Sequence, residues 1–257
     1  MTFVRPKKKL GQHFLKDLTV AERIAKLADF SSYGQILEIG PGMGVLTQFL
    51  PWDSGKVTVI EIDNESINYL NNTFPELKDN IHQGDFLKVD LSQIMGRHPF
   101  GIIGNFPYNI STQIVFKTLE YRDKIPFFAG MFQKEVAERI CEPPGSKKYG
   151  ILSVFAQLFY TVDYVFTVPP QVFNPPPKVD SGVICMHRKE NYVLACDEKM
   201  LFRIVKQAFQ QRRKTLRNSL KSLGLSKNIT EDSIFDQRPE KLSGADFVAL
   251  TKKITHG

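Results

Sequence analysis

The sequence has few of the residues that build metal sites and disulfide frameworks. Three cysteines occur in 257 residues, none at C-x-x-C spacing, and their odd number argues against structural disulfides. The five histidines are scattered, without the H-E-x-x-H or other spacing of metal ligands. We therefore expect no bound metal and a reducing compartment, the cytoplasm.

Long apolar runs and negative charge are also scarce. The most apolar region, residues 150–168, is interrupted by Gln157 and Asp163, so we expect a buried helix followed by a strand and no membrane partner. The N-terminal residues MTFVRPKKKLGQHFL are basic but lack the apolar stretch of a signal peptide. Lysine and arginine number 34 against 27 aspartate and glutamate, a formal net charge of +7 that suits an anionic partner such as nucleic acid.

Apolar strand-like segments alternate with helical segments over the first half of the chain. Strands are expected at 35–39, 56–62, around Ile81, at 100–104 and at 126–132. Helices are expected from a capping-box pattern at Thr19–Glu22, from near Val45, over 64–74 and after Phe132. This alternation predicts an α/β fold with a parallel, doubly wound, Rossmann-like sheet.

The pattern changes after residue 145. A helix over 149–159 precedes two candidate antiparallel edge strands, 162–168 and 181–187, and strand signals stop near residue 190. We therefore expect two domains, a Rossmann-like domain at 1–189 and a small helical domain at 190–257.

The glycine-rich stretch GPGMG at residues 40–44 follows the first of these parallel strands. Glycines let main-chain N–H groups approach a ligand closely, and Gly40 and Gly42 are the candidate contacts. The dinucleotide fingerprint needs G-x-G-x-x-G spacing, which this loop lacks because Val45 follows Gly44. A pyrophosphate cradle is therefore disfavoured, and an ordinary tight turn is the alternative to a ligand-binding loop.

Acidic residues end the next two strands. Glu61 ends the second, where a carboxylate can accept hydrogen bonds from both hydroxyls of a ribose. Asp85 ends the third, where it can accept a hydrogen bond from an adenine amine. A ligand with adenine and ribose but no phosphates suits this set, and S-adenosylmethionine is such a ligand. The alternative is that these acids are solvated strand ends.

The fourth strand ends in Asn105-Phe106-Pro107-Tyr108. An exocyclic adenine amine is a poor nucleophile because its lone pair is delocalised into the ring, so acceptors for both of its N–H groups assist it. We expect the Asn105 oxygen to be one acceptor and the carbonyl of Phe106 or Pro107 to be the other, in a turn stiffened by proline. Tyr108 offers a face for base stacking, and positioning supplies most of the catalysis. A plain strand-terminating turn is the alternative.

These motifs together resemble those of the bacterial small-subunit (16S) ribosomal RNA adenine dimethyltransferase family. They occur in the family's order and approximate spacing, as KKKLGQHFL (7–15), LEIGPGMGVLT (37–47), VIEID (59–63), GDFLKVD (84–90), NFPYNIS (105–111), VFNPPPKVDS (172–181), QRRKTLRNSL (211–220) and RPEKLS (238–243). The resemblance implies a class I S-adenosylmethionine-dependent methyltransferase. It implies two methyl transfers to the N6 amine of each of two adjacent adenosines in the 3′-terminal hairpin of small-subunit rRNA. The implied partner is a pre-ribosomal 30S particle, and we expect a monomer.

The resemblance also implies roles for single residues. Those expected to contact the cofactor are His13, Leu15, Gly40, Glu61, Asp85 and Asn105. Those expected to close the site or to hold the target base are Gln12, Phe14, Tyr108 and Phe173. Phe106 departs from the usual Leu or Ile and is expected to alter the shape of the base pocket, whereas His13 replaces an Asn found in many members. A surface role for His13 and plain core packing for Phe173 are the alternatives.

Residues 201–221, LFRIVKQAFQQRRKTLRNSLK, hold seven basic residues and no acidic one. We predict an amphipathic helix that packs by an apolar stripe and offers one basic face to RNA phosphates. With a basic arm near the N-terminus, the expected RNA-binding residues are Lys7, Lys8, Lys9, Arg203, Lys206, Arg213, Arg217 and Lys221. A solvated basic face is the alternative.

Three other functions are weighed against the small-subunit rRNA enzyme. A large-subunit rRNA adenine methylase of the antibiotic-resistance type shares the four strand-end motifs, but the proline-rich 172–181 and the RPEKLS motif favour the small-subunit enzyme. A non-catalytic RNA-binding assembly factor on the same fold is disfavoured by the intact Asn105, Pro107 and Tyr108. A nicotinamide oxidoreductase is disfavoured by the glycine spacing.

Overall fold

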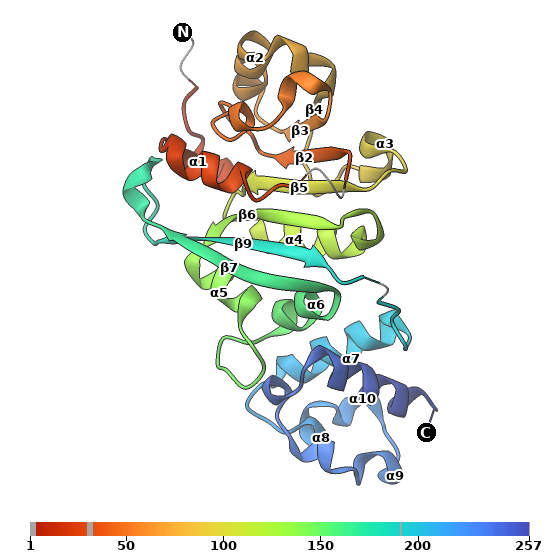
Figure 1. Ribbon diagram of the computed structural model, residues 1–257. Helices are drawn as coiled ribbons and strands as arrows, with labels where there is room; N and C mark the ends of the chain where they lie inside the picture. The colour runs from red at the N-terminus through yellow and green to blue at the C-terminus, as the bar shows by residue number, and fades with distance from the viewer. Residues whose placement is uncertain (1–3, 30–32, 191, 257) are drawn as a thin grey trace. The chain divides into compact units, whose positions relative to one another are not determined.

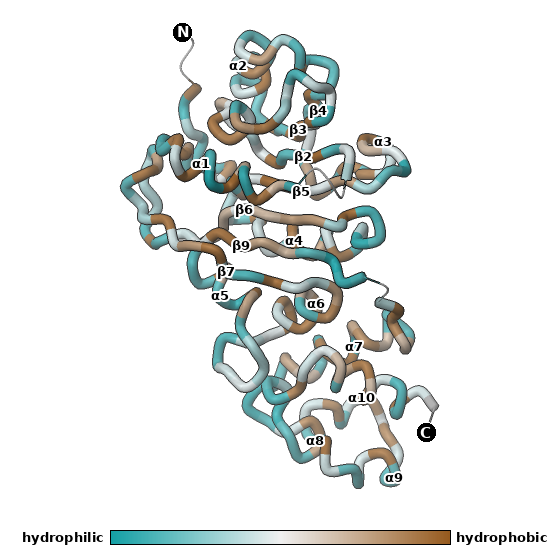
Figure 2. Tube along the Cα trace, in the orientation of Figure 1, coloured by the Kyte–Doolittle hydropathy of each residue, from teal (hydrophilic) through white to brown (hydrophobic). Residues whose placement is uncertain are grey.

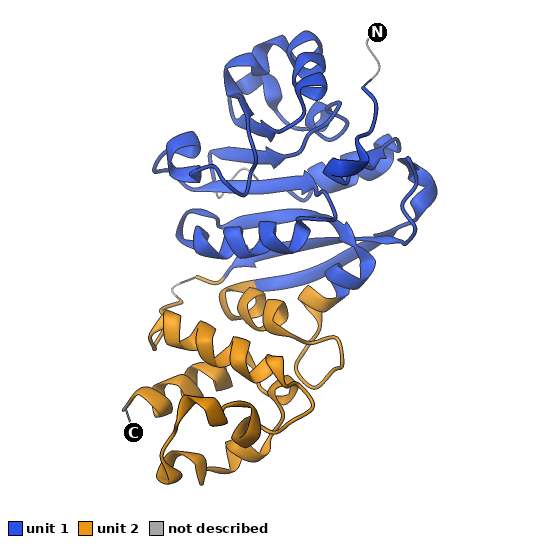
Figure 3. Cartoon of the chain, turned by 180° about the vertical axis from the view of Figure 1, so that it is seen from behind, with its two compact units in different colours: residues 1–138, 161–188 blue, residues 139–160, 189–257 orange. Residues whose placement is uncertain are grey.

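The computed structural model of the chain describes residues 4–29, 33–190 and 192–256. It divides into two compact units, shown in different colours in Figure 3. Unit 1 consists of residues 1–138 and 161–188, and unit 2 consists of residues 139–160 and 189–257.

This division differs from the expected domain boundary after residue 189 chiefly in residues 139–160. Aromatic packing within unit 2 explains the difference. The Phe155 ring stacks on Phe202 with centroids 3.9 Å apart, and Tyr149 lies 6.3 Å from Phe209. The segment therefore shares an apolar core with the C-terminal helices, a long-range contact that strand and helix patterns do not reveal.

Unit 1 is built on a seven-stranded sheet in the order β4-β3-β2-β5-β6-β9-β7 (Figure 1). The strands are β2 (Gln35–Ile39), β3 (Val57–Glu61), β4 (Ile81–Gln83), β5 (Phe100–Asn105), β6 (Phe127–Gln133), β7 (Tyr160–Val168) and β9 (Ser181–Arg188). The first five in this spatial order are parallel, and β9 runs antiparallel to β6. The predicted α/β fold and each predicted strand are confirmed.

The burial of each strand agrees with its place in the sheet. The strands β2, β3, β5 and β6 are apolar and buried almost throughout, as expected of parallel strands covered on both faces. In contrast, β7 alternates between exposed and more buried residues and lies at the sheet edge. The prediction of two edge strands was wrong for β9, which lies between β6 and β7. Its continuous burial, shared by Val183 and Ile184, suits that central position.

Helices cover this sheet and form unit 2. Those that begin in unit 1 are α1 (Leu18–Ala25), α2 (Asn64–Thr73), α3 (Leu91–Met95), α4 (Ser111–Glu120) and α5 (Lys134–Cys141). Those of unit 2 are α6 (Ile151–Phe159), α7 (Glu198–Gln210), α8 (Leu216–Ser219), α9 (Lys227–Thr230) and α10 (Gly244–His256). None of the helices in the described ranges is long and apolar enough to cross a membrane.

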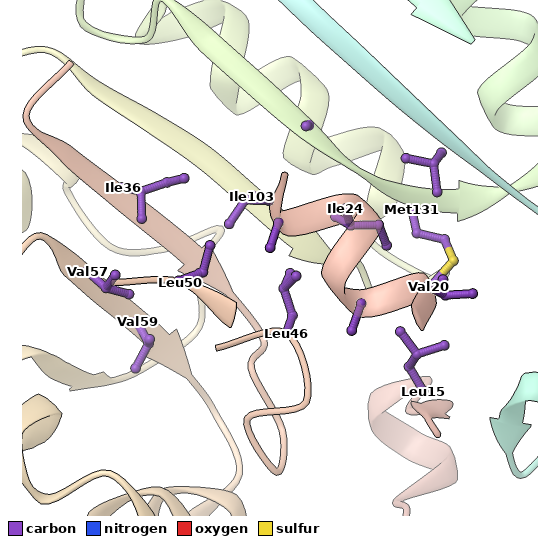
Figure 4. Close-up of a cluster of buried hydrophobic side chains, with 14 of the residues drawn as sticks. Leu15, Val20, Ile24, Ile36, Leu46, Leu50, Val57, Val59, Ile103 and Met131 are labelled. Atoms are coloured by element: carbon purple, nitrogen blue, oxygen red, sulfur yellow. The ribbon is translucent and has the colours of Figure 1, made fainter. Parts of the chain in front are cut away.

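An apolar cluster joins α1 to the sheet. Figure 4 shows Val20 and Ile24 of α1 beside Ile103 of β5 and Met131 of β6. The tube along β6 is coloured mostly on the apolar side of the scale in Figure 2. Because the side chain of Ile24 is fully buried, the cluster fixes α1, and the chain that leads into it, on the sheet.

The helix expected from Val45 is wrong. The glycine loop is followed by turns and a short 3₁₀ helix at Thr47–Phe49. Pro51 supplies the physical reason, since the residue before a proline is pushed out of the helical region and Leu50 is extended. Between Gly44, which has a left-handed backbone, and the extended Leu50, the chain forms turns and the 3₁₀ helix instead.

A second, two-stranded sheet joins two of the motifs. Strand β1 (Phe14–Leu15) pairs antiparallel with β8 (Phe173–Asn174), and Lys16 N–H donates to the Val172 carbonyl at 2.7 Å. The sequence did not predict these strands, because two residues are too short for a periodic pattern. The pairing holds the N-terminal segment against the proline-rich loop.

The predicted basic helix over 201–221 is also wrong as a single element. Helix α7 ends at Gln210, and the chain turns before the short α8. The Arg212 guanidinium donates to Ser146 O, and Leu216 N–H donates to Gln237 O, both at 2.8 Å. These bonds within unit 2 replace the continuation of the helix. The predicted basic residues therefore do not share one helix face.

The N-cap of α1 differs from the predicted capping box at Thr19 and gives a stability test. Asp17 Oδ1 accepts the Thr19 and Val20 N–H groups at 2.9 and 3.3 Å. We expect Asp17→Ala to lower the free energy of unfolding by about 1 kcal/mol, because two helix donors lose their acceptor. Thr19→Ala, the matched control, should change it little in urea titrations. Equal losses in the two variants would contradict Asp17 as the cap.

Candidate functional site

A cavity of about 260 Å³ opens at the carboxyl ends of the parallel strands in unit 1. Open α/β sheets bind ligands at this edge. It is lined by strand ends and by the N-terminal segment of residues 10–14. The predicted site residues that line it are His13, Gly40, Gly42, Glu61, Asp85, Asn105, Phe106, Pro107 and Tyr108. The topology thus brings together most of the residues that the sequence singled out.

Two glycines of the loop make room for aromatic rings. Gly42 has φ +57°, and a Cβ there would lie 2.9 Å from the Phe14 ring. Gly44 has φ +74°, and a Cβ there would lie 2.3 Å from Phe74. Both positions combine a left-handed backbone with close packing, which only glycine satisfies. The loop is therefore more than an ordinary tight turn, because Gly42 lets Phe14 cover it.

The Glu61 carboxylate is bound to the backbone. Its Oε1 accepts the Ile62 and Asp63 N–H groups at 2.8 and 2.9 Å, and its Oε2 accepts Gly42 N–H at 3.0 Å. Burial raises the pKa of Glu61, and the three N–H donors oppose that rise. A carboxylate has about four acceptor positions, so one on Oε2 is left for a ligand hydroxyl.

Asp85 closes the turn after β4. Its Oδ1 accepts Leu87 N–H at 3.0 Å, and its Oδ2 lies 3.8 Å from the Lys88 ammonium. The side chain is partly exposed and lines the cavity together with Phe86 and Leu87. A carboxylate beside two apolar side chains suits a flat ring that carries an N–H donor.

Asn105 is oriented by the N-terminal segment. Its Nδ2 donates to the His13 carbonyl at 3.1 Å, which leaves Oδ1 as the acceptor of the side chain. Of the two carbonyls expected as the second acceptor, that of Pro107 already accepts Ile110 N–H at 3.2 Å. This favours the Phe106 carbonyl.

Tyr108 is held by neighbours on two sides. Its hydroxyl hydrogen-bonds to Ser181 Oγ, and its ring stacks on His13 with centroids 5.4 Å apart. His13 Nδ1 lies 2.8 Å from the Pro175 carbonyl and therefore carries a proton, because a carbonyl only accepts. Burial raises the pKa of Tyr108, so its hydroxyl stays neutral near pH 7. The structure thus places His13 against Tyr108 as well as beside the cavity.

Three predicted site residues have buried side chains. The Phe106 ring is 1% exposed and packs on Phe128 and Phe132, with centroids 5.1 Å away in each case. Leu15 and Phe173 do not line the cavity but lie in the apolar cluster. The Phe106 ring thus packs in the core although the residue lines the cavity, so its effect on the shape of the base pocket stays a prediction.

Asp63 and Glu65, to which the sequence assigned no role, hold the N-terminal segment. The Lys7 ammonium pairs with Asp63 and with Glu65, and Gln12 Nε2 donates to Asp63 at 3.4 Å. The pairing with Lys7 contributes to a lowered pKa of Asp63, against the effect of burial. Asp63 was quoted in the VIEID motif, but only a three-dimensional contact reveals its role.

Comparisons with known proteins agree with this geometry. The family model of ribosomal RNA adenine dimethylase matches residues 4–254. The chain belongs to the ribosomal RNA adenine dimethylase family. It is 61% identical to ribosomal RNA small subunit methyltransferase A of Flavobacterium johnsoniae, over 99% of this chain and 97% of the relative. It is 56% identical to the protein of that name from Bacteroides fragilis, over 99% and 94%.

Solved structures extend the family likeness to the fold. A dimethyladenosine transferase from Plasmodium falciparum superposes with a TM-score of 0.79 at 26% identity, covering 95% of this chain and 98% of that one. The 23S rRNA methyltransferase ErmE gives a TM-score of 0.67 at 24% identity, covering 95% and 100%, and is similar in fold. This chain therefore has the class I methyltransferase fold.

The basic residues predicted for this dimethylase chain fall into two groups. Lys7 and Arg217 have acidic partners, Arg217 pairing with Asp236 at 2.7 Å. The others are exposed and have no ion pair within the described residues, and they are Lys8, Lys9, Arg203, Lys206, Arg213 and Lys221. The structure thus shows separate exposed cations where one continuous basic helix face was predicted.

Beneath the glycine loop, Glu38 gives a pH test. It is buried in β2, and its Oε2 accepts the Thr47 hydroxyl at 2.7 Å. Burial raises the pKa of Glu38 to about 8, from about 4.5 for the free side chain. The folded state therefore binds a proton that the unfolded chain has released, and this stabilisation is full below pH 4.5 and lost as the pH rises to about 8.

We expect Glu38→Gln to remove this pH dependence, because an amide does not titrate. Stability measured by urea titration should fall more steeply in the wild type than in the variant between pH 4.5 and 8. The steepest difference should be about 1.4 kcal/mol per pH unit. The exposed control Glu76→Gln should leave the wild-type curve unchanged. Parallel curves for wild type and Glu38→Gln would contradict the assignment.

Proposed function

We propose that this chain transfers methyl groups from S-adenosylmethionine to the N6 amines of two adjacent adenosines in the 3′-terminal hairpin of small-subunit rRNA. The observation that carries the proposal is that Glu61, Asp85 and Asn105 line one cavity at the ends of parallel strands. Family membership supports the reaction, and the names of the curated relatives support the small subunit as the source of the RNA.

The cavity fits the methyl donor by its chemistry. Ile39 and Ile60 lie among its lining residues beside Glu61, and Phe86 and Leu87 stand beside Asp85. We assign Glu61 Oε2 to a ribose hydroxyl and the Asp85 carboxylate to the adenine amine. The bound donor supplies an electrophilic methyl group on a sulfonium sulfur.

The turn after β5 prepares the target amine. Asn105 Oδ1 and the Phe106 carbonyl accept its two N–H groups and direct its lone pair toward the cavity, while the Tyr108 ring supports the base. The amine loses its proton to solvent after the transfer, so no side chain acts as a base. Pro107 fixes the turn, and Tyr108 is held by Ser181 and His13.

RNA contact is assigned to the exposed cations. Lys8 and Lys9 stand beside the cavity-lining segment, whereas Arg203, Lys206 and Arg213 belong to unit 2. We propose that these residues neutralise phosphates of rRNA within a pre-ribosomal 30S particle, with the protein acting as a monomer in the cytoplasm.

Asn105→Ala tests the catalytic assignment. We expect the rate of methyl transfer to fall at least about 100-fold, because the target amine loses an acceptor and its orientation. Binding of S-adenosylmethionine, measured by calorimetry, should remain detectable. The measurement is incorporation of labelled methyl groups into unmodified small-subunit rRNA in 30S particles, with the modified adenosines mapped by mass.

Large-subunit rRNA serves as the substrate control and Asn109→Ala as the protein control. Asn109 also lines the cavity, but its exposed side chain has no place in the assigned mechanism, so transfer should persist. Full activity of Asn105→Ala would remove Asn105 from the mechanism. Labelling of large-subunit rRNA in place of small-subunit rRNA would reject the proposed substrate.

The two groups of cations make a matched pair for RNA binding. Replacing Arg213 by Gln should weaken RNA binding and reduce the slope of log affinity against log salt by about 1, because one phosphate contact is lost. Arg217→Gln should reduce the slope less, because Arg217 is already paired with Asp236. Filter binding over a range of salt concentrations measures both. An unchanged slope for Arg213→Gln would leave Arg213 a merely solvated cation.

A further inference from the structure

Helix α4 carries a buried lysine to which the reaction assigns no role. Lys117 is only 8% exposed, although lysine is among the residues least often buried. Burial lowers the pKa of its ammonium group, against the effect of nearby carboxylates. A buried cation is costly unless it is well hydrogen-bonded, so its partners indicate what it does.

Those partners are in the turn that carries Asp85. The Lys117 Nζ donates to the Phe86 carbonyl at 2.6 Å and to the Val89 carbonyl at 2.5 Å. It also lies 5.0 Å from the centroid of the buried Phe86 ring, within cation–π range. One ammonium group therefore fixes two carbonyls and one ring of the same turn.

Apart from Lys117, the turn is held by its own bonds and by Gly84 N–H, which donates to the Glu61 carbonyl at 2.9 Å and attaches the start of the turn to the end of β3. The Asp85 carbonyl accepts the Lys88 and Val89 N–H groups at 2.9 and 3.2 Å, and Asp85 Oδ1 accepts Leu87 N–H. These bonds define the shape of the turn and its attachment to β3, but none of them reaches β5, the strand that bears Asn105. The bonds from Lys117 attach it to α4.

The other end of α4 is attached to the turn after β5. The Ser111 hydroxyl donates to the Tyr108 carbonyl at 3.1 Å, and Ile110 N–H donates to the Pro107 carbonyl at 3.2 Å. The same helix thus starts in the turn that bears Asn105 and reaches the turn that bears Asp85. A helix is a stiff connector, so the two turns keep a fixed separation.

We propose that Lys117 is a positioning residue that holds the Asp85–Leu87 turn at a set distance from the Asn105 turn, so that adenosine bound at one end of the cavity places the methyl group at the other. The inference rests on the proposed function, in which Asp85 receives the adenine of S-adenosylmethionine. Lysine suits this place because an apolar side chain would leave the Phe86 and Val89 carbonyls without their donor.

The test compares Lys117→Met with Lys124→Met. Lys124 lies in the 3₁₀ helix Arg122–Lys124, which follows α4. Its ammonium group donates to Ser92 Oγ and to Gly96 O at 3.0 and 3.1 Å, and none of these three residues lines the cavity. Calorimetry with S-adenosylmethionine should show an affinity about tenfold lower for Lys117→Met, equivalent to 1.4 kcal/mol, and no change for Lys124→Met. Methylthioadenosine, which keeps the adenosine half, should lose affinity by the same factor.

Further measurements separate positioning from a general loss of stability. In Lys117→Met the KM for S-adenosylmethionine should rise while RNA affinity stays at the wild-type value. Lys117→Gln, which keeps two N–H donors, should bind the donor with intermediate affinity, and it carries the test if the methionine variant does not fold. All affinities are measured well below each variant's melting temperature.

The outcomes are distinct. Wild-type affinity for S-adenosylmethionine in folded Lys117→Met and Lys117→Gln, even with a lower melting temperature, would overturn the positioning role. Equal losses in Lys117→Met and Lys124→Met would overturn it too, since the effect would then be a general loosening. A wild-type protein that binds no S-adenosylmethionine would instead reject the proposed function on which the inference rests.

Discussion

The hydrogen bond from the Asn105 amide to the His13 carbonyl joins the two parts of the chain that make the cavity. Parallel strands alone bring Gly40, Glu61 and Asn105 to one sheet edge, but an open edge is exposed to water. Residues 10–14 cover that edge, and the bond to His13 makes the orientation of the Asn105 amide depend on the cover. The segment that covers the cavity therefore also orients Asn105, the proposed acceptor for the target amine.

The cover stays in place because it is attached on opposite sides. At one end, Lys7 pairs with Asp63 and Glu65 at the start of α2. At the other end, β1 pairs with β8, and His13 Nδ1 hydrogen-bonds to the carbonyl of Pro175, the residue that follows β8. The N-terminal segment is thus held by backbone pairing, by ion pairs and by a side-chain hydrogen bond together. They also couple the cover to the loop before Ser181, which binds Tyr108.

The sequence predicted the strand ends and most of the cavity because these follow from local pattern. Gly40, Glu61, Asp85 and Asn105 each stand at or just after the end of an apolar strand. Because β2 to β6 are parallel, these strand ends meet at one edge of the sheet. Side-chain direction at the Asn105 turn was not predictable in that way. The position of Phe106 in the motif suggested the base pocket, yet its ring fills the space above Gly104 and Gly130, where a Cβ would lie 2.7 and 2.3 Å from it.

Tertiary bonds account for the failure of the predicted helix over 201–221. The basic run of 201–221 has helical spacing throughout, but bonds from Arg212 and from the Leu216 backbone end the helix at Gln210. Leu216 and Leu220 are still buried, as an apolar stripe requires. The pattern thus predicted which residues are inside and failed on the continuity of the element, because a helical period does not register a turn made by distant partners.

Buried ionisable groups around the cavity show how the fold tolerates charge where it needs precise backbone positions. Glu61 is held by three N–H groups that also shape the glycine loop and the start of α2. Lys117 is held by two carbonyls of the Asp85 turn. Glu38 has one hydroxyl donor, and burial raises its pKa to about 8, so near neutral pH it is largely protonated. The three N–H donors of Glu61 oppose the effect of burial on its pKa, whereas Glu38 has a single hydroxyl donor that opposes the same effect.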